Sequence, residues 1–394
     1  MNKIYLDYAA TTPVDPAVVK TMQPYFSKIF ANPASFHSYG QEAKSGLEKA
    51  RKKVAEFIGA HDDEIVFTSG GTESNNLAIK GVAYKNGKRG NHIITSNIEH
   101  HAILNPCKFL EKQGYRVSYL PVDKNGLIDP DDVKKVITDK TILISIMHAN
   151  NEIGTIQPVE EIGTMARERE IYFHTDAVQT LGHIPVNVED IHVDLLSASA
   201  HKLYGPKGVG FLYIKKGTKI SSFMHGGEQE YGLRASTHNI PGIVGLGKAV
   251  EVAKSHLREE GAKLTDLRNQ LIEGVLKNIE HTMLNGHPKK RLPNNANIAI
   301  QYVEGESMLL DLDMEGIICS TGSACSSMSL EPSHVLLSLG LSYEVAHGSL
   351  RFSLGKYTER ADIDTVIEVL PKIVKRLRTI SSLYSSSKST TIIN

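Results

Sequence analysis

Residues 194–202 indicate the fold most directly: Asp194-Leu195-Leu196-Ser197-Ala198-Ser199-Ala200-His201-Lys202. The stretch begins as a short apolar run of the kind that forms a buried strand. It is followed by Tyr204-Gly205-Pro206-Lys207-Gly208, through which neither a helix nor a strand can continue. Lys202 is therefore predicted where a strand ends in a tight loop. A desolvated lysine there can attack an aldehyde, but it could equally be an ordinary surface residue in a turn.

Strand patterns alternate with helical patterns through the first two thirds of the chain. Apolar runs are found near residues 64–68, 92–96, 115–120, 141–147, 171–175, 194–199 and 209–214. This alternation predicts an α/β fold with a mainly parallel seven-stranded sheet flanked by helices. Ligands of such sheets lie beyond the carboxyl ends of the strands. The polar residues expected there are Thr72, His100, Asn151, Asp176, Gln179 and Lys202.

Bulk properties narrow the class of protein. The chain has 394 residues with 44 basic and 44 acidic side chains, so its charge favours neither nucleic acid nor an anionic membrane as partner. No apolar run is long enough to span a bilayer, and Asp7 precedes any apolar signal region. The three cysteines, Cys107, Cys319 and Cys325, argue against a disulfide framework. A cytoplasmic location is therefore expected.

The patterns also suggest two domains. A large domain is predicted over residues 16–258, and a smaller α+β domain over residues 1–15 and 259–394. The smaller domain carries Cys325 and a Ser- and Thr-rich tail that begins at Ser381. The boundary is placed inside a long helical stretch between Asn239 and Asn278.

Three features together match the needs of pyridoxal phosphate. Lys202 could hold an aldehyde, and Gly70-Gly71-Thr72, at the start of a predicted helix, could hold a phosphate. Asp176 could pair with a protonated ring nitrogen. Further hydrogen bonds could come from Gln179, Ser199 or His201, and His100 could stack on the ring. Each residue also has an ordinary interpretation: a capped helix at Thr72, a helix cap at Asp176, and a turn at Asn151.

Two residues of the predicted smaller domain could act on a substrate. Cys325 lies in Ser323-Ala324-Cys325-Ser326-Ser327, where a thiolate could be a nucleophile, although a free thiol at a helix cap fits as well. Arg351 lies on a predicted strand among apolar neighbours, where a guanidinium could grip a carboxylate or form a structural ion pair. Cys319 is predicted in a buried strand, and Cys107 is predicted to pack within a helix.

The sequence resembles the class V aminotransferase family, and within it the cysteine desulfurases of the NifS/IscS type. The resemblance extends from residue 5 to residue 355. The segments that carry it are Gly71-Thr72-Glu73-Ser74-Asn75-Asn76, Glu99-His100, Asn150-Asn151-Glu152-Ile153-Gly154, Asp176-Ala177-Val178-Gln179, Ser199-Ala200-His201-Lys202 and Ser323-Ala324-Cys325. The long Ser-rich segment around the cysteine resembles group I of these enzymes. The fold implied is that of pyridoxal phosphate enzymes of fold type I.

The resemblance implies a role for each cofactor residue. Lys202 binds the cofactor covalently and later moves protons. His100 stacks on the ring and transfers protons. Asp176 pairs with the ring nitrogen. The other implied contacts are with the ring hydroxyl (Gln179), with the ring or the substrate (Asn151), and with the phosphate (Gly71, Thr72, Ser199, His201, and Thr237 reaching across a homodimer interface).

The resemblance also implies the reaction and the partners. Arg351 binds the carboxylate of L-cysteine, and Cys325 takes its sulfur as a persulfide while L-alanine leaves. The sulfur goes to an iron–sulfur scaffold or another acceptor protein, with iron–sulfur cluster assembly the favoured use. No metal site is expected, although Cys325 could transiently ligate a cluster shared with a scaffold.

Alternatives and departures stay open at this point. A class V transaminase would share Lys202 and Asp176 without needing Cys325, and a selenocysteine lyase would differ only in substrate. A non-catalytic binding protein would not need Lys202 and Asp176, and both are present. Two positions depart from the family pattern: Ser236 stands where glycine is usual, and Ala34 where serine is common.

Overall fold

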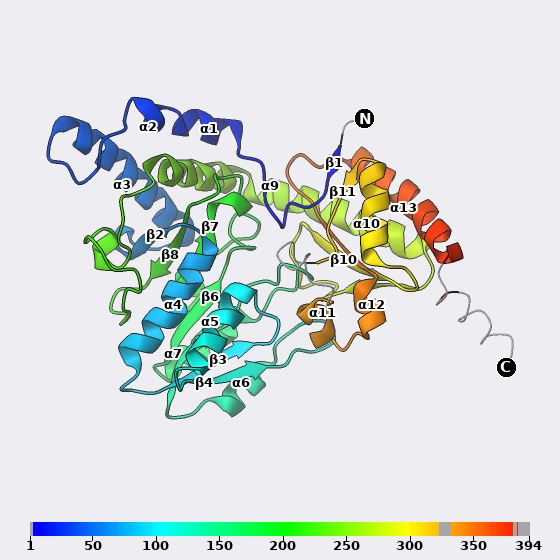
Figure 1. Ribbon diagram of the computed structural model, residues 1–394, viewed down its shortest axis with the longest axis horizontal. Coiled ribbons are helices and arrows are strands. Elements are labelled where there is room, and N and C mark those ends of the chain that lie inside the picture. Colours follow the sequence, from blue (N-terminus) through cyan, green and yellow to red (C-terminus); the bar gives the residue numbers. More distant parts are fainter. Residues whose placement is uncertain (1–2, 323–331, 381–383, 385–394) are drawn as a thin grey trace.

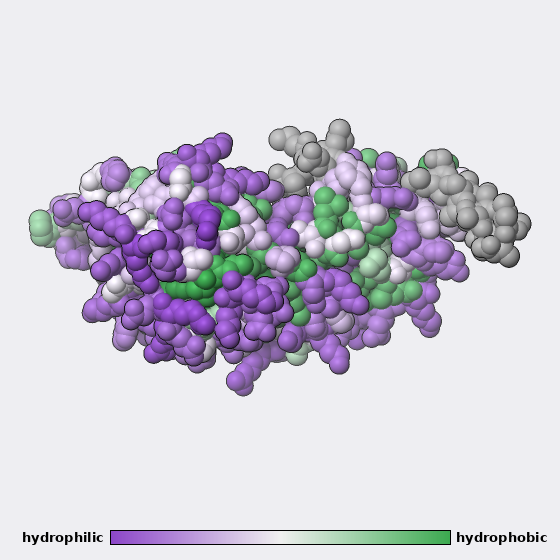
Figure 2. Space-filling view, turned by 90° about the horizontal axis from the view of Figure 1, so that it is seen from below, coloured by the Kyte–Doolittle hydropathy of each residue, from purple (hydrophilic) through white to green (hydrophobic). Residues whose placement is uncertain are grey.

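The computed structural model describes residues 3–322, 332–380 and 384, and Cys325 lies outside them. Figure 1 shows a larger α/β body and a smaller body, with helix α9 (Ile240–Asn278) running from one to the other. Hydrophilic side chains cover most of the face shown in Figure 2, and hydrophobic ones gather in patches between them. Within the described ranges, none of the helices is both long and apolar enough to cross a membrane.

The larger body is built on a seven-stranded sheet with strand order β2-β8-β7-β6-β5-β3-β4. Its strands are β2 (Ile65–Thr68), β3 (His92–Ser96), β4 (Arg116–Leu120), β5 (Thr141–Ser145), β6 (Tyr172–Asp176), β7 (Leu195–Ser199) and β8 (Gly210–Ile214). All neighbouring pairs are parallel except those of β8, which runs antiparallel to both β7 and β2. The predicted sheet, mainly parallel with seven strands, is therefore confirmed.

Helices cover both faces of this sheet because the strands are apolar on both faces. Alternate side chains of a strand point to opposite faces, so Ile65 and Phe67 join one core and Val66 the other. The first core includes α3 (Ser38–Ile58), α7 (Val159–Glu168) and the start of α9, and the second includes α4 (Gly71–Asn86) and α5 (His101–Glu111). Shorter helices are α1 (Pro16–Met22), α2 (Pro24–Ser27), α6 (Pro130–Val136) and α8 (Val188–Ile191).

The smaller body has its own core. A three-stranded antiparallel sheet, β12-β10-β9, packs with the end of α9, and the short strand β1 pairs in parallel with β11. Its elements are β1 (Ile4–Tyr5), β9 (Thr282–Asn285), β10 (Asn295–Ile300), α10 (Gly305–Met314), β11 (Ile317–Ile318), α11 (His334–Ser338), α12 (Tyr343–His347), β12 (Ser349–Ser353) and α13 (Arg360–Ile380).

Helix α9 contributes to both cores. Its residues up to Val250 belong to the core of the larger body, and those from Leu264 onward belong to that of the smaller one. The domain division at residue 258 falls between these two points. It stays a prediction, which the separate cores support.

Candidate functional site

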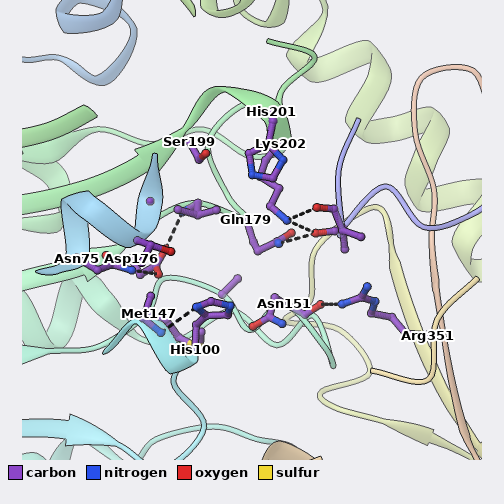
Figure 3. Close-up of a pocket in the computed structure, with 17 residues that line it drawn as sticks. Asn75, His100, Met147, Asn151, Asp176, Gln179, Ser199, His201, Lys202 and Arg351 are labelled. Carbon is purple, nitrogen blue, oxygen red and sulfur yellow. Dashed lines mark hydrogen bonds between the residues drawn. The ribbon is translucent and has the colours of Figure 1, made fainter. Parts of the chain in front are cut away.

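A cavity lies at the carboxyl ends of β6 and β7, next to the start of α4 (Figure 3). The predicted residues that line it are Gly71, Thr72, His100, Asn151, Asp176, Gln179, Ser199, His201, Lys202 and Arg351. The cavity lies at the carboxyl ends of parallel strands, as expected for such a sheet, and Arg351 of the smaller body also lines it. Their individual roles stay predictions.

Lys202 ends the short 3-10 helix that directly follows β7. Its Nζ donates hydrogen bonds to the carbonyl oxygens of Ala9 and Ala10, at 2.5 and 2.7 Å. These carbonyls come from the N-terminal segment that leads from β1 toward α1, so this segment forms one wall of the cavity. The amine thus points into the cavity, and the surface-turn alternative for Lys202 is wrong.

Asp176 is the last residue of β6 and is 7% exposed. One carboxylate oxygen accepts a hydrogen bond from Asn75 Nδ2 at 2.7 Å, and the other accepts from the backbone N–H of Val178 at 3.0 Å. The second bond belongs to a turn, because no helix begins in the described residues between β6 and α8, so the helix-cap alternative for Asp176 is wrong. Asn75 was not singled out as a site residue, although it lies one helical turn after Gly71, on the segment that carries the family resemblance. Its side chain fixes the direction in which the carboxylate points.

The start of α4 packs closely against Val178 beside the cavity. A Cβ atom on Gly71 would come within 2.6 Å of Val178 Cγ2, so only glycine fits between them. Ser199 and His201 line the same cavity. Burial, together with the nearby charges of Lys202 and Lys207, lowers the pKa of His201 to about 4. The imidazole is therefore neutral at pH 7, and its Nδ1 lies 3.1 Å from Thr11 Oγ1.

His100 caps the start of α5. Its Nδ1 accepts a hydrogen bond from the backbone N–H of Ala102 at 3.1 Å, so the proton of the neutral ring resides on Nε2. The preceding residue, Glu99, is fully buried, and one of its oxygens accepts from Ser96 Oγ and Met147 N–H. Burial, and to a lesser extent the charge of Asp176, raises the pKa of Glu99 to about 8. Sequence reasoning gave Glu99 no role.

Arg351 lies on β12 and is 1% exposed. Its Nη2 donates to Asp7 at 2.7 Å, and its Nη1 donates to the carbonyl oxygen of Asn151 at 3.1 Å. Its Nε is buried without a hydrogen-bond partner among the described residues. The structural ion pair proposed as an alternative therefore exists, yet the side chain also lines the cavity. Gln179 Nε2 meanwhile donates to Ala9 O at 3.1 Å.

Two predicted site residues are not placed at this cavity. Thr237 is exposed and is not among the described residues that line the cavity of its own chain. Ser236, which precedes it, has a φ of 93°, a conformation that suits glycine better than serine. Cys325 lies outside the described residues. Cys107 and Cys319 are both buried, as predicted.

The donor set fits pyridoxal phosphate. Lys202 offers an amine, Asp176 offers an oriented carboxylate for a ring nitrogen, and Gly71 and Thr72 line the cavity at the start of α4, where backbone N–H groups suit a phosphate. In Figure 3, Asp176 and Arg351 lie on opposite sides of the view with Lys202 and His100 between them. If a cofactor ring lay beside Asp176, Arg351 could bind a substrate that is attached to the cofactor.

Comparison with known proteins agrees with this geometry. Residues 4–366 match the family described as Aminotransferase class-V. A protein named cysteine desulfurase IscS from Dictyoglomus turgidum is 58% identical over 380 residues, which cover 96% of each chain. A solved structure described as a NifS-like protein superposes with a TM-score of 0.90 at 39% identity, covering 95% of this chain and all of that one. A structure described as SspA in complex with cysteine gives 0.80 at 40% identity, covering 90% and 100%.

Fold and cavity together define a pyridoxal phosphate enzyme of fold type I. The chain belongs to the class V aminotransferase family.

Proposed function

We propose that this protein is a cysteine desulfurase that releases L-alanine from L-cysteine and passes the sulfur to an acceptor through Cys325. The observation that carries the proposal is the shared cavity, which Lys202, Asp176 and the buried Arg351 all line. Two relatives support the substrate, one named a cysteine desulfurase and one described in complex with cysteine.

The proposed role of each cofactor-binding residue follows from its position in the cavity. Lys202 holds the cofactor, while Gly71, Thr72, Ser199 and His201 surround its phosphate. The neutral His201 can donate only one hydrogen bond, so it recognises the phosphate without adding a charge. When bound, pyridoxal phosphate supplies an electron sink that delocalises charge from the substrate. Asp176, held by Asn75, keeps the ring nitrogen protonated and thereby strengthens that sink.

A second set of residues in the cavity is proposed to bind L-cysteine and to transfer its protons. Arg351 pairs with the carboxylate of L-cysteine, and Asn151, whose carbonyl oxygen accepts from Arg351, supports the ring or the substrate. His100, whose ring lines the cavity, would carry a proton between cofactor and substrate.

Sulfur transfer requires a nucleophile on the chain. The thiolate of Cys325 attacks the substrate sulfur, so that an S–S bond forms and the C–S bond breaks. The electron pair of the C–S bond stays on the carbon side, and a proton delivered there completes L-alanine. Cys107 and Cys319 are poor candidates for this step because burial raises the pKa of both thiols, that of Cys107 to about 12.

The working unit is proposed to be a cytoplasmic homodimer. Thr237, exposed on its own chain, would reach the phosphate of the partner subunit. Phe26, Phe30 and Phe36 are exposed by 65%, 67% and 98%, which would be unusual for rings facing water in a single copy. The acceptor is proposed to be an iron–sulfur scaffold or another sulfur-acceptor protein, with iron–sulfur cluster assembly as the use of the sulfur.

The proposal is tested by supplying competing substrates to the purified, cofactor-loaded protein. Alanine and sulfide should both be released from L-cysteine in the presence of a thiol reductant. Release of alanine from L-selenocysteine alone would point to a selenocysteine lyase. Transfer of an amino group to a keto acid, with no sulfide formed, would point to a transaminase.

A further inference from the structure

The backbone between Gln229 and His238 is held in a conformation that ordinary residues avoid. Three residues of this segment other than glycine have positive φ angles: Glu230 at 47°, Tyr231 at 58° and Ser236 at 93°. Such angles persist where the surroundings hold the chain in place. Thr237 directly follows the last of the three.

A buried ion pair provides the first anchor of this segment. Glu230 and Arg51 have side chains that are 1% and 4% exposed, and Arg51 donates to both carboxylate oxygens at 2.9 and 2.7 Å. Glu230 also accepts from the backbone N–H of Phe67 at 2.7 Å, and His238 Nε2 lies 2.7 Å from its other oxygen. One carboxylate therefore ties both ends of the segment to α3 and β2.

A second ion pair connects the segment to the start of α4. Arg234 Nε donates to Glu73 Oε1 at 2.9 Å, and the other oxygen of Glu73 accepts from Ser69 N–H at 2.7 Å. Both side chains are largely buried, at 19% and 9% exposed. Glu73 stands two residues after Gly71, in the first turn of the helix whose start lines the cavity.

The anchors do not bring Thr237 to the cavity of its own chain. Its side chain is exposed, although the residues around it are tied down at three points. A rigid, solvent-facing threonine has no evident purpose within a single copy. Holding a segment in its bound conformation before association lowers the entropy cost of the contact that it later makes.

We infer that the Arg51–Glu230–His238 cluster and the Arg234–Glu73 pair are positioning groups that preset Thr237 to complete the phosphate end of a second copy's cavity. This inference rests on the proposed cofactor and homodimer. It adds that cofactor affinity in one subunit depends on ion pairs located in the other. If the ion pairs served only to stabilise the fold, their loss would act within the subunit that carries the change.

Arg234→Ala is the variant of choice because Arg234 is the most exposed member of the two anchors. We expect the affinity of the apoprotein for pyridoxal phosphate, measured by absorbance titration, to fall about tenfold in Arg234→Ala and in Thr237→Ala. The double variant should be scarcely weaker than Thr237→Ala, because the pair would act through Thr237. The control is Lys372→Ala, from an exposed pair with Glu368 on α13, which should leave the affinity unchanged.

Mixed dimers decide which subunit is affected. An Arg234→Ala chain is paired with a Lys202→Ala chain, so only the first gives the lysine-linked absorbance, and its cavity faces the intact segment of the second. We expect the cavity of the Arg234→Ala chain to bind pyridoxal phosphate with wild-type affinity. A weakened affinity there, additive losses in the double variant, or a monomer in sedimentation would overturn the inference. Desulfuration at saturating cofactor is measured separately: its absence would refute the proposed function, and an unchanged affinity in Arg234→Ala would refute this inference alone.

Discussion

Arg351 and Asp7 form an ion pair of 2.7 Å across 344 residues of sequence, joining β12 to the N-terminal segment at the edge of the cavity. The arginine side chain is 2% exposed and the aspartate side chain 16%. This geometry holds the guanidinium in one orientation at the cavity, which supports the proposed binding of a substrate carboxylate there. The same N-terminal segment supplies the carbonyl oxygens that bind Lys202, so it contacts both ends of the site.

Replacing Arg351 with lysine keeps the charge but removes the planar fork. Because two parallel hydrogen bonds to a carboxylate are lost, we expect KM for L-cysteine to rise at least about tenfold, the effect of roughly 1.4 kcal/mol. The value of kcat should change much less. Steady-state kinetics on Arg351→Lys test this, with Arg376→Lys, from a more exposed pair with Asp311, as the control. An unchanged KM would leave Arg351 with a structural role only.

Asn75→Ala removes the side-chain donor that orients Asp176. The freed carboxylate oxygen loses a hydrogen bond to a charged group, which is worth about 1.5–3 kcal/mol. We therefore expect cofactor affinity to fall by at least about tenfold while the fold is retained, as checked by circular dichroism. Asn76→Ala is the matched control, since Asn76 donates to the carbonyl oxygen of Thr72 on the more exposed side of the same helix. Equal affinities in the two variants would contradict the role given to Asn75.

Glu99 should make the stability of the fold depend on pH. Its pKa is raised to about 8 by burial, whereas the unfolded chain titrates near 4.5. The native state therefore binds more protons between these values, and the stability present below pH 4.5 is lost as the pH rises toward 8. The loss is about 1.4 kcal/mol per pH unit.

The comparison that isolates this effect is with Glu99→Gln, which cannot titrate. In urea unfolding at pH 5, 6, 7 and 8, the free energy of unfolding of Glu99→Gln should increase relative to that of the wild type as the pH rises. Contributions from the buried histidines cancel in the difference. Parallel curves for the two proteins would mean that Glu99 does not retain its proton in the fold.

Ser236→Gly should stabilise the protein. Serine at a φ of 93° carries backbone strain that glycine avoids, and the side chain is exposed. We expect the free energy of unfolding to increase by about 1 kcal/mol, the strain relieved less the extra chain entropy of glycine. Urea denaturation measures this directly. A decrease would show that the serine side chain makes a stabilising contact.

The local sequence pattern was sufficient to predict many of the residues that line the cavity. The positions of Lys202 and Asp176 could be predicted because Asp176 ends one apolar strand and Lys202 closely follows another, and the carboxyl ends of parallel strands meet at one edge. Gly71 could be predicted because a glycine pair between a strand and a helix start is typical of a phosphate site. The antiparallel direction of β8 could not be predicted, since a buried strand looks the same in either direction.

The partners of the predicted residues were missed for a different reason. Asp7 lies next to Arg351, and Asn75 next to Asp176, only because separate elements pack together. Hydrophobic periodicity places an element but does not say which polar side chain of another element it will face. The same limit applies to Glu230 and Arg51, which are 179 residues apart.

The proposed reaction transfers sulfur to Cys325 from L-cysteine held in the cavity that Lys202 and Arg351 line. The most direct measurement is alanine and sulfide release from L-cysteine by the wild type, Cys325→Ala and Lys202→Ala, each with its absorbance spectrum. We expect a yellow wild type that turns over. Cys325→Ala should lose turnover while L-cysteine still changes its spectrum, and Lys202→Ala should lose both activity and the lysine-linked absorbance. Full desulfuration by Cys325→Ala would show that Cys325 is not the residue that takes the sulfur.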